Sequence, residues 1–331
     1  MKTIASTGTL LLFSFLSSVG QAWGMGRIEE KAWRAMLEDP AFVGEPVKET
    51  SQLEKDLFTE YQKRRTPHFF VETSRDADAA RAYAAFCEWA YGDFLRWAGK
   101  DAETYGLWNV RAHVAVIANR GEWESLMLAR NRDASRFVKE KLKKVGGQWS
   151  ARGLFTLVHS RGDATLEGEC LQLFHTLNHL FLHGLAKSGP EGCVWWLWEA
   201  FSMMRGVEVF GAPGPGCTDF KTGVEHRDDP AWRDPDAWVR LLKVDVRMKQ
   251  DEPFVVFRHK DVQSIRQTTY VKAWSILRYL TRGKRERAKF VAFLERLKTK
   301  GDQDRALQDV LGMDAETLDG RWRRWVRRQR G

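Results

Sequence analysis

Cysteine and proline are scarce in this 331-residue sequence, which holds four and nine of them. No two cysteines have the C-x-x-C spacing that is typical of zinc sites and redox motifs. After the first 22 residues, no apolar stretch approaches the roughly 20 residues that span a bilayer, and the mean hydropathy is −0.46. The length and these absences exclude a disulfide-stapled mini-protein, a C-x-x-C site and a multi-span membrane protein.

Aromatic residues and positive charge are plentiful. The sequence has 15 tryptophans, and its hydrophobic and charged shares of 43% and 29% are ordinary for a globular protein. Large rings therefore make up much of the expected core. The net charge of +9 mildly favours anionic surfaces and ligands.

The amino terminus has the pattern of a secretory signal. Lys2 precedes a short apolar run over 10–16, and the small residues Gly20 and Ala22 fit the −3 and −1 positions of a cleavage site. We predict a signal peptide over 1–22, and hence a secreted or periplasmic protein. The alternative is an uncleaved anchor, which the short apolar run disfavours.

Export makes disulfides possible for the four cysteines, Cys87, Cys170, Cys193 and Cys217. Three full pairings exist, and the sequence does not choose among them. Cys193 and Cys217 bracket one predicted helix and are the first pair to test. Cys87 lies on an apolar helix face and is expected to be a buried free thiol.

Periodicity divides the mature chain into three parts. Residues 23–66 predict a lead-in of one or two short helices, and 67–160 predict a small subdomain containing strands. Its predicted elements are strands over 68–73, 110–117 and 153–158, a helix over 76–98, and an exposed helix and loop over 129–148. Residues 161–331 predict helices alone, over 165–186, 192–209, 232–243, 261–281, 286–298, 302–311 and 314–328. The fold class expected is α+β, with a β-containing amino-terminal part followed by an all-helical part.

One predicted helix carries a polar stripe on an otherwise apolar circumference. The stripe consists of Gln172, His175, Thr176, His179 and His183. A solvent-exposed face usually carries Lys, Glu or Arg, but none occurs between Glu169 and Lys187. A helix this apolar should be buried, and buried polar side chains need partners. The stripe is therefore interpreted as a site in preference to an ordinary solvent face.

His175 and His179 have the spacing by which one helix supplies two nitrogen ligands to zinc. His183 lies about 12 Å along the axis from His175, too far to join them on a straight helix. Glu199 is the single acidic residue in the next apolar segment, 195–202, and a buried carboxylate also needs a partner. A short turn over 187–192 would make the two helices antiparallel and place Glu199 opposite the histidines.

These residues resemble a known family. Two histidines four residues apart, followed about twenty residues later by Trp196-Leu197-Trp198-Glu199, are similar to the gluzincin metallopeptidases. The closer resemblance is to peptidase-MA-like domains of exported bacterial proteins, which read His-Glu-x-x-His and then Trp-Leu-x-Glu-Gly. The strand and helix from His68, the segment from Tyr270 to Trp274 and the closing helices over 302–328 extend the resemblance across much of 67–328. It implies a zincin-like architecture, with His175, His179 and Glu199 as zinc ligands and Tyr270 as a weaker match to an oxyanion donor.

The departures from that pattern concern catalysis. Thr176 stands where the family has the glutamate that takes a proton from zinc-bound water, and Ala200 replaces the glycine after the ligand glutamate. A threonine hydroxyl is not a base near neutral pH, and loss of a positioned base costs on the order of 10² to 10⁴ in rate. Glu169, six residues before His175, points elsewhere on the helix. The resemblance thus implies a degenerate active site.

The carboxyl terminus, 321–330, interleaves arginines with Trp322 and Trp325. Such a pattern can bind nucleic acid or an anionic membrane. We favour an amphipathic terminal helix whose tryptophans dock on the core, so nucleic acid is not an expected partner.

Three functional hypotheses remain open. The first is a secreted, metallopeptidase-like pseudoenzyme that acts by binding a protein or peptide, with or without a retained zinc ion. The second is an active zinc hydrolase whose general base is not identified. The third is a polyanion- or envelope-binding protein that uses the fold only as a scaffold.

Overall fold

The computed structural model describes residues 30–57, 59–133, 135–136, 139, 146–151, 153–159, 166–186, 194–213, 234–260, 267–297 and 299–329. The predicted signal peptide (1–22), the predicted turn (187–192) and two of the cysteines, Cys193 and Cys217, lie outside these residues. The prediction for Cys87 is confirmed, since it is a buried free thiol whose pKa burial raises.

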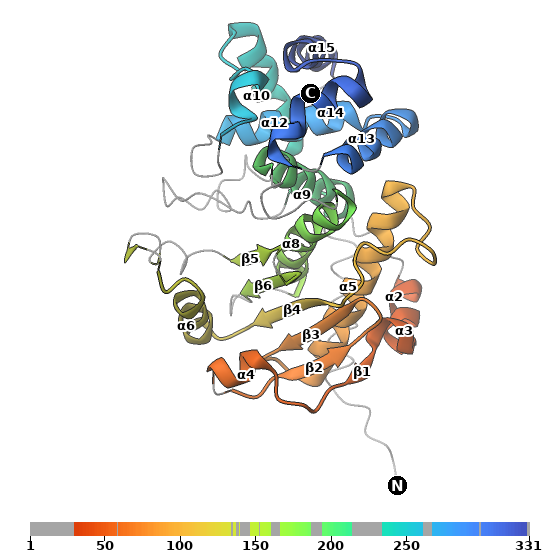
Figure 1. The fold of residues 1–331 in the computed structure, drawn as a ribbon, viewed down its shortest axis with the longest axis vertical. Coiled ribbons are helices and arrows are strands. Elements are labelled where there is room, and N and C mark those ends of the chain that lie inside the picture. The colour runs from red at the N-terminus through yellow and green to blue at the C-terminus, as the bar shows by residue number, and fades with distance from the viewer. Residues whose placement is uncertain are drawn as a thin grey trace.

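Six strands form one mixed sheet in the order β1-β2-β3-β4-β6-β5 (Figure 1). The central strands β3, β4 and β6 are parallel, while β1, β2 and β5 pair antiparallel at the two edges. Their bounds are Glu45–Pro46 (β1), Gln62–Arg65 (β2), Phe69–Thr73 (β3), Ala112–Ile117 (β4), Gly147–Ser150 (β5) and Phe155–His159 (β6).

Helices cover both faces of the sheet. On one face lie α5 (Ala77–Ala98), which packs on β2 and β3, and α8 (Leu166–Ala186), which packs on β5 and β6. On the other lie α4 (Gln52–Leu57) and α6 (Arg120–Arg130), which contact each other around a smaller core. Strand β4 alternates accordingly, with Val114 and Val116 in the large core and Ala115 and Ile117 in the small one.

From α9 onward the described elements are helical and lie at the other end of the molecule (Figure 1). Helix α9 packs between α8 and α12, helices α10, α13 and α15 contact α12, and α13 also contacts α8 and α5. The helices of this half are α9 (Trp195–Phe210), α10 (Pro235–Met248), α11 (Phe254–Phe257), α12 (Gln267–Leu280), α13 (Lys284–Arg296), α14 (Gln303–Ala306) and α15 (Ala315–Arg328). Short 3-10 and π segments, Lys300–Asp302 and Leu307–Leu311, flank α14, while α2 (Glu30–Glu38) and α3 (Pro40–Val43) precede the sheet.

The expected α+β class is confirmed, with the sheet in the amino-terminal half and helices after it. One hydrophobic core runs from Phe69 in β3 through α8 and α9 to Trp322 in α15. The sheet and the helical half are therefore packed together through α8.

Three local predictions were incomplete or wrong. The lead-in over 23–66 also contains strands β1 and β2, whose Gln62-Lys63-Arg64-Arg65 segment has no apolar alternation because it lies near the sheet edge. Helix α6 begins at Arg120 and was not predicted. The helix and loop predicted over 129–148 lie largely outside the described residues, and only the ends of the segment differ, since α6 ends at Arg130 and the half-buried strand β5 begins at Gly147.

Candidate metal site

Helix α8 runs through the centre of the molecule, which explains its apolar circumference. Leu173, Leu177 and Leu180 are fully buried in the main core. Four of the five residues of the polar stripe are buried too, with the side chains of His175 and His179 only 1% exposed, and the fifth, His183, is half-buried. The expectation that this stripe is not a solvent face is confirmed.

Helix α9 packs along α8 and brings Glu199 to the two histidines. The Nε2 atoms of His175 and His179 are 3.1 Å apart. One oxygen of Glu199 lies 3.5 Å from Nε2 of His175, and the other lies 3.4 Å from Nε2 of His179. The three residues are buried and offer ligand atoms within 4.8 Å of one another. Segments separated by about twenty residues thus converge on one point.

The spacing of these atoms fits a small cation. Nitrogen and carboxylate oxygen ligands lie about 2.0–2.2 Å from zinc, so two ligands at tetrahedral angles are about 3.4 Å apart. The 3.1, 3.4 and 3.5 Å separations are close to that value. Two imidazoles and one carboxylate are also a ligand set that zinc takes in proteins. The donor atoms therefore match a three-ligand metal centre in kind and in spacing.

The surroundings of His179 keep its ring neutral. Burial lowers the pKa of His179 to about 3, although the Glu199 carboxylate acts in the opposite direction. The indole of Trp149, from the edge strand β5, stacks on the imidazole with 5.1 Å between centroids and 10° between planes. A neutral, oriented imidazole is the form that binds a metal ion.

Thr176 faces the edge strand and not bulk solvent. Its hydroxyl donates to the backbone carbonyl of Leu173 at 3.0 Å, and the residue is fully buried. A Cβ atom built on Gly147 would lie 3.0 Å from the Thr176 methyl and 2.6 Å from the Gln172 amide nitrogen. Glycine at 147 thus lets strand β5 approach α8 at the residue that follows the first histidine.

Glu169 is held away from the cluster. Its carboxylate accepts hydrogen bonds from the Arg75 guanidinium, at 2.7 Å, and from the Tyr83 hydroxyl. Burial and the neighbouring Glu169 raise the pKa of Tyr83. Glu169 therefore serves as the acceptor of a buried network between α8 and α5, and it does not act as a base for the histidines.

The other residues singled out in the sequence lie at different places. The ring of Tyr270, on α12, packs edge-on against Trp195, one turn before Glu199, with centroids 5.5 Å apart. The oxyanion role that the resemblance implies for Tyr270 stays a prediction. His183 is half-buried on α8, and burial lowers its pKa. As expected from its distance along the helix, it is outside the cluster formed by the described residues.

Sequence reasoning missed the contribution of strand β5. Trp149 and Gly147 stand beside the histidine pair, yet the strand is only four residues long and follows a basic segment. The Gly146-Gly147 pair is the one local signal, since glycine within a strand often marks a close backbone approach.

Comparison of the chain with protein-family models and with curated proteins finds no match. Among the described residues, no helix combines the length and apolar character needed to cross a membrane.

Proposed function

We propose that this chain is a secreted or periplasmic, gluzincin-like protein that holds one zinc ion and acts by binding a protein or peptide. The observation that carries the proposal is the buried convergence of His175, His179 and Glu199 from two helices. The spacing of the donor atoms and the neutral state of His179 support zinc as the ion.

Each residue has a distinct role in this proposal. His175 and His179 supply neutral nitrogen donors, and Glu199 supplies the negative charge that partly compensates a divalent cation in a buried site. Trp149 fixes the ring plane of His179 by stacking on it. Bound zinc would supply Lewis-acid chemistry to any oxygen ligand that reached it.

Among the described residues, the two positions considered for a base are engaged in other contacts, which favours binding over catalysis. At the position where the family has its proton acceptor, Thr176 carries a hydroxyl that already donates to the Leu173 carbonyl. The nearby carboxylate of Glu169 is held by Arg75 and Tyr83. These contacts support a pseudoenzyme, and an active hydrolase with another base is the competing outcome of the test.

Metal analysis of the purified protein tests this function. We expect one zinc ion per chain by atomic emission after dialysis against zinc and then against buffer. His175→Ala, His179→Ala and Glu199→Ala should each lose it or weaken the affinity more than tenfold, since a three-ligand site loses a ligand. His183→Ala is the matched control, because it removes a half-buried histidine from the same helix outside the cluster.

Two results would contradict the proposal. Zinc retained equally by all four variants would show that the ion binds elsewhere. Chelator-sensitive cleavage of a peptide library by the unmodified protein, lost in His175→Ala, would instead establish the active hydrolase.

A further inference from the structure

Helix α10 carries apolar side chains on two sides. Its inner side, which includes Trp238, Leu242 and Val246, is buried in the core. Leu241, Val244 and Met248 recur at i, i+3 and i+7 on another side and are 39%, 54% and 59% exposed. Helix α11, the next along the chain, also exposes two apolar side chains, Val255 and Val256. The core does not need this outer stripe, and exposed apolar groups in a cluster mark interaction surfaces.

Basic residues border the apolar stripe. At 100° per residue, Arg240, Lys243 and Arg247 fall together along one side of it. Arg240 and Arg247 are exposed, and Lys243 is half-buried. Arg240 also pairs with Asp234 at 3.1 Å, but both partners of that ion pair are largely in water. Helix α10 thus presents aliphatic and cationic groups side by side.

Helix α15, which both α10 and α11 contact, carries a second group of positive charges. Arg321, Arg324 and Arg328 recur at i, i+3 and i+7 and are exposed, on the side opposite the buried Trp322 and Val326. None of the three arginines has an ion-pair partner among the described residues. They therefore remain available to an external anion.

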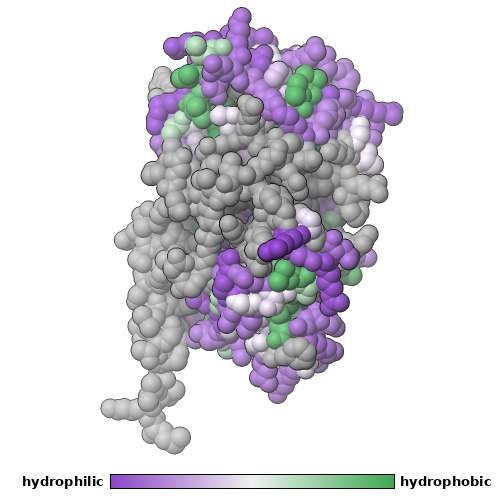
Figure 2. Space-filling model, turned by 90° about the vertical axis from the view of Figure 1, so that its left-hand side faces the viewer, coloured by the Kyte–Doolittle hydropathy of each residue, from purple (hydrophilic) through white to green (hydrophobic). Residues whose placement is uncertain are grey.

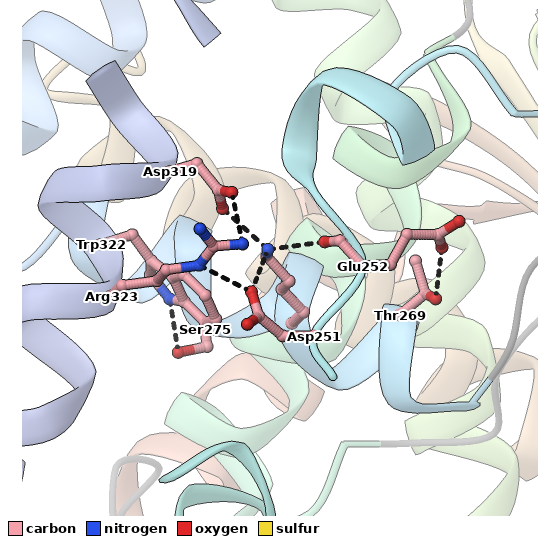
Figure 3. A network of polar contacts seen from close by, with 8 residues as sticks. Asp251, Glu252, Thr269, Ser275, Asp319, Trp322 and Arg323 are labelled. Atoms are coloured by element: carbon pink, nitrogen blue, oxygen red, sulfur yellow. Dashed lines mark hydrogen bonds and ion pairs between the residues drawn. The ribbon is translucent and has the colours of Figure 1, made fainter. Parts of the chain in front are cut away.

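A buried network fixes the position of this arginine stripe. The ammonium of Lys272, on α12, contacts Asp251 and Asp319 at 2.7 Å each, and Arg323 of α15 contacts the same two aspartates (Figure 3). The indole of Trp322 donates to the Ser275 hydroxyl at 3.0 Å. Since α15 is anchored by its inner side, its outer arginines form a rigid part of the surface.

We propose that this end of the molecule docks on anionic lipid headgroups through α10, by Leu241, Val244 and Met248 and the bordering Arg240, Lys243 and Arg247, here termed the α10 surface. The α15 arginines add to the positive potential of the same end of the molecule. Figure 2 shows hydrophobic patches among hydrophilic residues at the helical end of the molecule. Arginines attract phosphate headgroups, and the aliphatic groups of α10 enter the boundary between headgroups and acyl chains. A soluble polyanion would use the arginines and leave the aliphatic stripe without a role.

Vesicle sedimentation with the purified protein tests the proposal. We expect binding to vesicles of phosphatidylcholine with 30% phosphatidylglycerol, little binding to pure phosphatidylcholine, and weakening as salt rises from about 0.1 to 0.5 M. The triple variant Arg240→Gln, Lys243→Gln, Arg247→Gln should bind on the order of a hundredfold more weakly, at about fivefold per charge. The triple variant Leu241→Ser, Val244→Ser, Met248→Ser should lose about tenfold or more.

Matched controls come from the sheet half of the molecule. Lys55→Gln, Arg132→Gln, Arg136→Gln removes the same charge from exposed positions, and Val110→Ser removes a 60% exposed valine. Both should bind vesicles as the unmodified protein does, and all variants should keep its melting temperature.

Three outcomes would overturn the proposal. Equal binding to neutral vesicles would remove the role of charge, and no sedimentation with either vesicle would remove the surface altogether. Heparin binding that survives the serine variant, without any vesicle binding, would assign the arginines to a soluble polyanion.

Discussion

At the scale of single residues, Thr176 stands beside the histidine pair of the candidate metal site. Its hydroxyl is used within α8, and its methyl packs at the close approach of Gly147. Both contacts are structural. Thr176 is fully buried, and it occupies the position where a catalytic carboxylate would need space and a path for its proton to reach the reacting atoms.

Replacing Thr176 with glutamate should give opposite results with and without metal. With zinc bound, Thr176→Glu supplies the missing base next to the first ligand, and a measurable gain in chelator-sensitive peptide cleavage is expected. Without zinc, a new carboxylate joins a buried stripe, and the free energy of unfolding should fall by about 2–4 kcal/mol. Cleavage rates and urea unfolding, each with zinc and with chelator, check the two arms.

Thr176→Gln is the control for this substitution. It adds the same volume against Gly147 without a charge, so it should destabilise the protein in both conditions and give no cleavage. Equal activity of the glutamine and glutamate variants would show that the added carboxylate is not acting as a base.

At the scale of elements, helix α15 is held by charge as well as by packing. Lys272 is 1% exposed in its side chain, and its two aspartates are 2% and 8% exposed. Breaking a buried ion pair by removing one partner typically costs about 3–5 kcal/mol, because the remaining charge is uncompensated. The docking of α15 should therefore depend on this lysine.

Lys272→Met keeps the length of the side chain and removes the charge between Asp251 and Asp319. We expect the free energy of unfolding to fall by about 3–5 kcal/mol, measured by urea denaturation. Adding Asp251→Asn should recover part of the loss, since one uncompensated charge is then removed. Arg323→Met, which removes a partly exposed partner of the same aspartates, should cost less than about 1 kcal/mol. A loss as large for Arg323→Met as for Lys272→Met would contradict this account.

The helices and strands also show how much of the fold could be predicted from the sequence alone. Long helices with clear periodicity, such as α5 and α8, were predicted within a few residues, and so were the buried strands β3, β4 and β6. Strand β5 could not be predicted, because its four half-buried residues owe their conformation to pairing with β6.

The same limit applies to the candidate site. The convergence of His175, His179 and Glu199 was predicted from helical spacing and the cost of burying Glu199, whereas Trp149 lies on a strand that only a glycine pair marks in the sequence.

At the scale of the whole molecule, the candidate metal site lies where the two halves are joined. Helix α8 packs on β5 and β6, and α9 packs on α12. His175 and His179 lie on α8 and Glu199 lies on α9, so the cluster joins a helix that contacts the sheet to a helix of the other half. An ion held by both helices would strengthen the contact through which the sheet and the helical half share one core.

Zinc should therefore raise the thermal stability of the entire protein in a single transition. A ligand that binds only the folded state, at a concentration 100 times its Kd, stabilises the protein by about 2.7 kcal/mol, which for a chain of this size is an increase in Tm of about 4 °C. Calorimetry with zinc and with chelator measures the shift. Glu199→Gln should abolish it, because the amide lacks the charge that a buried divalent cation needs, while His183→Ala should keep it. If zinc instead splits the transition in two, or shifts the Tm of Glu199→Gln as much as that of the unmodified protein, then the ion does not join α8 to α9.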